Sequence, residues 1–158
     1  MEISITKLPP ESWQAYRDIR LKAIQCDPQA FAETLSQTLA RPEEEWKSYI
    51  QNMWFVLAGQ NIIGMIGLLK ETHDRANIIS LWVDPEHRGK KIGTKLIQYV
   101  LAYAQDIGIK TLNLTVTTTQ KAAIQVYMSL GFTIVAGHEK AICRDDAYFD
   151  QYLMEKRL

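Results

Sequence analysis

The chain has 158 residues, of which 47% are hydrophobic and 23% charged, so it suits one globular domain over residues 1–158 rather than a disordered chain. Eighteen basic residues balance eighteen acidic ones, which argues against a nucleic-acid or membrane-surface binder, because both need a basic face. No apolar run approaches the ~18 residues of a membrane span, residues 1–10 lack a signal-peptide core, and Cys26 and Cys143 fit no zinc motif. We therefore expect a cytoplasmic protein without a metal site.

The first third of the chain predicts one strand and two helices. Residues 2–7 alternate apolar and polar side chains, as a strand does, and helical spacing of apolar residues follows over 11–25. An Asp-Pro pair ends that helix. Segment 29–40 is ambiguous between a loop and a short helical turn. Pro42 with three glutamates after it is typical of a helix start, and this helix is expected to run to about Asn52.

Three strands are predicted next. Segments 54–58 and 62–69 flank a short turn and form a hairpin. A polar turn at 73–77 precedes a third strand at 77–84, whose nearly continuous apolar run indicates burial on both faces.

The last third alternates helices and strands. Apolar periodicity predicts a helix at 92–105, a strand at 111–117 and a second helix at 120–130. Segments 132–136 and 148–154 are expected to be two final strands joined by a polar connection. The strand–helix–strand unit in the middle of the chain predicts a right-handed parallel pair.

The loop at 84–94 joins a buried strand to a helix, where free backbone N–H groups and the helix dipole favour an anion. It contains Arg88, Gly89, Lys90, Lys91 and Gly93. Composition alone leaves an ordinary solvated loop equally acceptable. A P-loop would need glycine-lysine-serine/threonine, and a dinucleotide fingerprint would need three glycines; this loop has neither.

Two blocks carry a family resemblance. Leu81-Trp82-Val83-Asp84-Pro85 followed by Arg88-Gly89-Lys90-Lys91-Ile92-Gly93 resembles the acetyl-CoA signature of the GNAT family of N-acetyltransferases, Arg/Gln-x-x-Gly-x-Gly/Ala. Lys91 stands where the middle glycine is usual, so the backbone there must suit a non-glycine. Segment 120–132 resembles the family's Asn-x-x-Ala-x-x-x-Tyr-x-x-x-Gly-Phe helix, with Gln120 in place of asparagine.

The resemblance implies an α/β (α+β) fold of the GNAT type, as in bacterial single-domain members. It implies a mixed, mostly antiparallel sheet of six or seven strands, with a central parallel β-α-β unit and helices on both faces. It also implies acetyl-CoA as co-substrate. The residues that it assigns to acetyl-CoA binding are Leu81, Trp82, Val83, Arg88, Gly89, Lys90, Lys91, Ile92, Gly93, Thr94, Gln120 and Tyr127.

The expected reaction is direct attack of a primary amine of a small molecule or peptide on the thioester, within a ternary complex. Acyl transfer needs a polarised carbonyl, a neutral amine and a protonated leaving thiolate. The resemblance places a bulge N–H for the carbonyl near Trp82-Val83-Asp84 and makes Tyr127 the general acid. Spacing alone would make Tyr127 a core residue. The alternative function is a non-catalytic acyl-CoA sensor of the same fold.

The acceptor site and the base are less defined by sequence. Phe31, Glu33, Glu71 and Tyr148 are candidate substrate-binding residues, and Tyr16, Arg20 and Trp54 are further candidate wall residues. Glu33, Glu71, His73 and Asp84 are candidate bases, although a surface role suits each of them as well. Polyamines, amino acids, aminoglycosides and protein N-termini all remain open as acceptors. Exposed C-terminal strand edges favour a homodimer as one further expectation.

Overall fold

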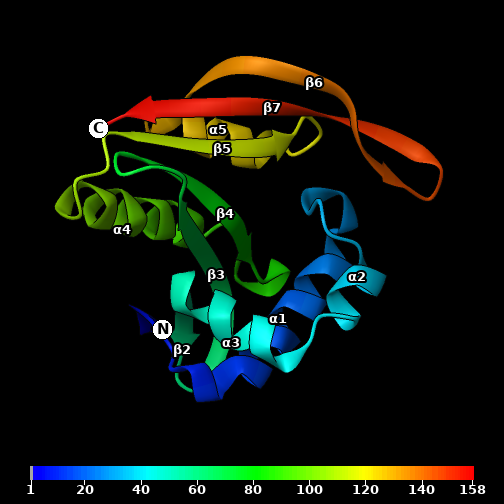
Figure 1. The fold of residues 1–158 in the computed structure, drawn as a ribbon, viewed down its shortest axis with the longest axis vertical. Coiled ribbons are helices and arrows are strands. Elements are labelled where there is room, and N and C mark those ends of the chain that lie inside the picture. The colour runs from blue at the N-terminus through cyan, green and yellow to red at the C-terminus, as the bar shows by residue number, and fades with distance from the viewer. Residues whose placement is uncertain (1) are drawn as a thin grey trace.

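One seven-stranded sheet runs through the computed structural model, which describes residues 2–158 (Figure 1). The strand order is β1-β2-β3-β4-β5-β7-β6, and only β4 and β5 pair in parallel. This confirms the predicted mixed, mostly antiparallel sheet with a parallel unit at its centre. The strands are β1 Ile3–Thr6, β2 Met53–Ala58, β3 Asn61–Lys70, β4 Arg75–Val83, β5 Thr111–Thr117, β6 Thr133–Arg144 and β7 Ala147–Arg157.

Helices cover both faces of the sheet, as predicted (Figure 1). They are α1 Trp13–Cys26, α2 Leu35–Leu39, α3 Glu43–Tyr49, α4 Ile92–Asp106 and α5 Lys121–Ser129. Strand β2 shows why two cores form, because its buried side chains alternate between faces. Trp54 and Val56 pack with α4, while Met53 and Phe55 pack with α1 and α3.

The chain departs from the predicted elements in three places. The ambiguous segment 29–40 contains a short helix, α2, which begins with a capping box between Thr34 and Gln37. Strand β4 begins at Arg75, inside the predicted turn 73–77. The expected polar connection after residue 136 is instead strand, because β6 and β7 form one long hairpin. Most of β6 is exposed at the sheet edge, so its sequence lacks the apolar alternation that would reveal a strand.

The central strands separate from one another, and this separation positions the site. Strand β4 pairs with β5 only from Arg75 to Asn77, opposite Thr111 to Asn113. Beyond that point the two halves of the sheet diverge (Figure 1). Over residues 2–158, no helix is long and apolar enough to cross a membrane, and no group of three histidine, cysteine or acidic side chains is placed to hold a metal ion.

Candidate active site

Two cavities lie beside the part of β4 that has separated from β5. The loop cavity, about 400 Å³, lies between the end of β4, the loop 87–94 and α5. The inner cavity, about 340 Å³, lies between β4 and β5, beneath the segment that joins α1 to α2. Four residues line both cavities: Ala30, Leu81, Gln120 and Ala123. The two cavities therefore adjoin each other.

The loop cavity ends at the start of α4, where the backbone donors are free. None of the N–H groups of residues 89–94 donates to another backbone group in the described chain, and Lys95 is the first to do so, to the Lys91 carbonyl at 3.1 Å. Gly89 (φ +79°) and Gly93 leave the surface open, because a Cβ at Gly93 would meet only Val83 Cγ2, at 3.9 Å. Lys91 caps the helix in the left-handed conformation, with φ 62°. A non-glycine residue therefore bears strain at this position.

The predicted cofactor residues gather around this cavity. All of them line it except Lys90 and Tyr127, and Tyr127 lines the inner cavity. Arg88 is turned back onto the protein, since its Nη2 donates to Asp27 at 2.7 Å and its Nε to the Val83 carbonyl at 2.9 Å. The Trp82 indole donates to the same Asp27 oxygen at 2.9 Å. Asp27 thus anchors the loop, a role hidden in the sequence, where it marks only a helix end.

Strand β4 carries a bulge next to both cavities. Met65 pairs with Trp82 and Gly67 with Ile79, so Ser80 and Leu81 share one partner position on β3. A bulge of this kind leaves a residue outside the ladder. The bulge was expected near Trp82-Val83-Asp84, and the structure has it at Ser80-Leu81, where Ser80 adopts φ +57°. Ser80 is a single polar residue within the apolar run of β4, and such a residue does not by itself mark a bulge in the sequence.

Tyr127 projects from α5 towards the inner cavity and packs edge-on against Phe132, with ring centroids 5.8 Å apart. The residue is 6% exposed, and burial raises the pKa of its phenol well above the ordinary value. No hydrogen-bond partner of its hydroxyl occurs in the described part of the chain. The phenol is thus both a core residue and a protonated donor at the cavity wall.

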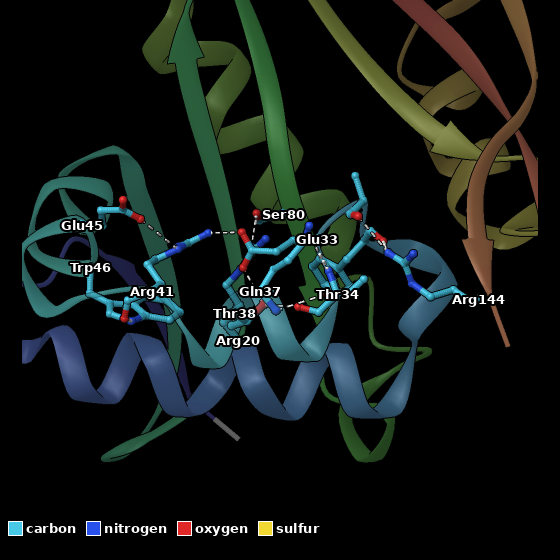
Figure 2. Close-up of polar contacts among 12 residues, drawn as sticks. Arg20, Glu33, Thr34, Gln37, Thr38, Arg41, Glu45, Trp46, Ser80 and Arg144 are labelled. Carbon is cyan, nitrogen blue, oxygen red and sulfur yellow. Dashed lines mark hydrogen bonds and ion pairs between the residues drawn. The ribbon is translucent and has the colours of Figure 1, made fainter.

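Three charged side chains line the inner cavity: Arg20 from α1, Arg41 from the turn before α3, and Glu33 between them (Figure 2). Glu33 accepts hydrogen bonds from Thr38 Oγ1, at 2.5 Å, and from Arg41 Nη2. Arg20 Nε lies 3.8 Å from Glu33 Oε1, and its Nη1 donates to Ser80 Oγ at 2.6 Å. The arginine cluster therefore touches the bulge itself.

Glu33 is held as a carboxylate. Burial alone would raise its pKa, but the hydrogen bond from Thr38 and the charges of Arg20 and Arg41 outweigh burial and lower the pKa of Glu33 below its ordinary value. A carboxylate that is already paired is a poor proton acceptor. This argues against Glu33 as the general base or as a free partner for an ammonium group.

The other predicted acceptor residues divide into two groups. Phe31 lines the inner cavity beside Arg20. Glu71 and His73 lie in the exposed turn between β3 and β4, outside both cavities, and Tyr148 is 62% exposed on the β6–β7 hairpin.

Asp84, a further candidate base, is engaged in structure. It accepts from Lys22 Nζ at 2.5 Å and from the Glu86 N–H at 3.0 Å. Tyr16 and Trp54 are buried in the two cores and line neither cavity. Arg41 is a charged residue of the inner cavity that sequence reasoning missed, and no motif marks it.

Comparisons with known proteins agree with this geometry. The model of the GNAT acetyltransferase family matches residues 13–132. N-acetyltransferase 8 from Homo sapiens is 32% identical in an alignment of 95 residues that covers 54% of this chain and 42% of that protein. A GNAT acetyltransferase structure from Streptococcus pneumoniae has a TM-score of 0.86 at 18% identity, over 99% of this chain and 100% of that chain. The structure of yncA from Salmonella typhimurium, with acetyl-CoA, has a TM-score of 0.85 at 16% identity, over 100% of this chain and 95% of that chain.

These matches define the class of protein. The family model covers most of the chain, from the first residues of α1 to the end of α5. The chain belongs to the GNAT acetyltransferase family. The match spans less than half the length of the human relative, and the two solved structures share the fold.

Proposed function

We propose that this protein transfers the acetyl group of acetyl-CoA to a primary amine by direct attack of the amine on the thioester. The observation that carries the proposal is the pair of adjoining cavities beside β4, one ending at free helix N–H groups and the other at Tyr127. A cofactor with phosphates at one end and a thioester at the other fits this order.

The loop cavity suits the CoA arm. The pyrophosphate would meet the N–H groups of residues 89–94 at the positive end of the α4 dipole. Leu81 and Val83, from the unpaired edge of β4, give the arm an apolar wall. The missing Cβ of Gly93 leaves room for close approach of a phosphate.

The inner cavity suits the chemical step. The amine attacks the thioester carbon, a C–N bond forms, and the C–S bond breaks as the amine loses a proton to solvent. An N–H group at the Ser80-Leu81 bulge would polarise the carbonyl. Tyr127 donates its proton to the departing sulfur. Because burial raises the pKa of a thiol as well as that of a phenol, the transfer stays feasible at a buried part of the cavity wall.

The test is release of free CoA from acetyl-CoA over a panel of primary amines, followed by chromatography. Tyr127→Phe should lower turnover about 100-fold, the low end for loss of general acid catalysis, and should leave CoA affinity unchanged. Tyr103→Phe is the matched control, because Tyr103 packs on Trp54 and lines neither cavity.

Two outcomes would count against parts of the proposal. Full turnover in Tyr127→Phe would show that Tyr127 is not the general acid. CoA binding without release by any amine would instead support the non-catalytic sensor.

A further inference from the structure

The inner cavity has an excess of buried positive charge. Its charged lining residues are Arg20, Arg41 and Glu33, so two cations face one carboxylate. The arginine side chains are 9% and 8% exposed. Arg41 is also 4.0 Å from Glu45, a side chain that is 57% exposed and does not line the cavity. One buried guanidinium therefore lacks a counter-charge within the cavity.

Packing fixes both guanidinium groups. Arg20 Cζ lies 5.3 Å from the centroid of the Phe31 ring. Arg41 Cζ lies over the Trp46 and Tyr49 rings, at 4.5 and 4.8 Å. Side chains held this way lose little further entropy when a ligand binds.

Hydrogen-bond donors remain unused on both arginines. Arg20 Nε and Arg41 Nη1 are buried and have no hydrogen-bond partner in the described chain. Glu33 does not satisfy them, because its Oε1 lies 3.8 Å from Arg20 Nε, beyond hydrogen-bond distance, and Arg41 reaches the carboxylate through Nη2 instead. Buried donors without partners are rare and costly, so the cluster would gain from an acceptor that pairs with them.

The cluster also lies close to the reacting group. Arg20 donates to Ser80, the residue at the bulge that would polarise the thioester carbonyl. An anion bound here would lie a short distance from the amine that attacks that carbonyl. The anion and the amine therefore fit one small molecule in a cavity of about 340 Å³.

We propose that the acceptor is a small amine that also carries a carboxylate, such as a free amino acid, with Arg20 and Arg41 binding the carboxylate. The planar guanidinium matches a carboxylate with two parallel hydrogen bonds. The same charge disfavours polyamines and aminoglycosides, because a polycation would meet net positive charge in a desolvated site. The inference rests on the proposed acetyl transfer and narrows its acceptor.

The experiment compares each amine with and without its carboxylate. L-amino acids and ω-amino acids are tested beside their carboxamides, with CoA release as the readout. The carboxamide has the less basic amine and so the larger neutral fraction, which favours it by chemistry alone. We expect at least one acid to exceed its amide by roughly 10- to 100-fold in kcat/KM, the range for hydrogen bonds to a charged group.

Variants assign the preference to the arginine cluster. Arg20→Met should abolish the preference in kcat/KM for the acid over its carboxamide, mainly by raising KM for the acid. Arg20→Lys should retain part of that preference. Arg17→Met is the matched control from the same helix, since Arg17 lines neither cavity. Thermal denaturation of each variant separates misfolding from lost recognition.

Each outcome distinguishes the two proposals. Equal kcat/KM for acids and amides across the panel, or an acid preference unchanged in Arg20→Met, overturns the carboxylate assignment and leaves acetyl transfer in place. Acetylation confined to peptides with an acidic second residue overturns the small-molecule part. Absence of release with every amine overturns the proposed function and, with it, this inference.

Discussion

The two cavities differ in whether backbone or side-chain groups line them. The loop cavity is lined by backbone N–H groups and by glycines that have no side chain, and the side chain of Arg88 is bound to Asp27 instead. The inner cavity presents side chains, above all a buried charge cluster contributed by separate segments. A backbone site suits a ligand shared by a whole family, because few sequence changes can alter it. A side-chain site can change its specificity by single substitutions.

This difference predicts opposite sensitivities. The inner cavity should fail when a side chain is removed, since partners are left buried without counter-charges. The loop cavity should fail when a side chain is added, since the ligand then meets a Cβ. Three substitutions test this contrast.

The largest effect is expected for Arg41→Met. The substitution leaves the Glu33 carboxylate with Thr38 and the more distant Arg20 as partners. Removing one member of a buried ion pair is strongly destabilising, so the free energy of unfolding should fall by about 3 kcal/mol. Urea denaturation followed by circular dichroism measures the change.

The double variant Arg41→Met/Glu33→Gln is the control for this prediction. It removes both charges and should recover at least half of the lost stability, because no carboxylate then remains unpaired. Should the double variant be no more stable than the single one, the loss belongs to stacking on Trp46 and Tyr49 and not to the ion pair.

Gly93→Val should break the loop cavity without unfolding the protein. The new side chain meets little of the protein itself, because the nearest atom to its Cβ is Val83 Cγ2 at 3.9 Å. It would, however, occupy the space next to the free N–H groups. We expect CoA affinity to fall roughly 10- to 100-fold, the value of one or two lost hydrogen bonds to a charged group. Isothermal titration calorimetry with CoA measures it.

The matched control for Gly93→Val is Gly137→Val. Gly137 lies in β6, has open space around it and lines neither cavity. The free energy of unfolding of both variants should lie within about 0.5 kcal/mol of that of the parent, as is usual for substitutions at the surface. Equal CoA affinity in the two variants would contradict the backbone cradle.

The same contrast explains what the sequence could predict. The glycines and basic residues of 84–94, placed between a strand and a helix, indicated an anion site, and the family pattern named its ligand. The order of strands and helices followed from periodicity, apart from the short helix α2 and the full length of the exposed edge strand β6. In these cases the signal lies within one continuous segment.

The inner cavity depends on contacts that no segment contains. Arg20 meets Ser80 across 60 positions of sequence. Ser80 is a single polar residue in an otherwise apolar strand, which does not by itself mark a bulge, and Arg41 precedes a helix as many surface arginines do. Tertiary packing alone brings these residues together.

The smallest effect is expected for Lys91→Gly, which sharpens the comparison by changing the backbone of the loop cavity without adding a side chain. Lys91 adopts φ 62° at the start of α4, a conformation that costs a residue with a Cβ about 1–2 kcal/mol. Glycine removes that cost but loses more entropy on folding, so the net gain in the free energy of unfolding should be about 0.5 kcal/mol. Lys91→Ala loses the same charge and keeps the Cβ, and it should show no gain. If alanine stabilises as much as glycine, relief of charge repulsion with Arg88 and Lys90 explains the change, and the left-handed cap carries no strain. If only glycine stabilises, the chain keeps lysine at this position at a cost in stability, as expected for a side chain retained for its charge beside a phosphate site.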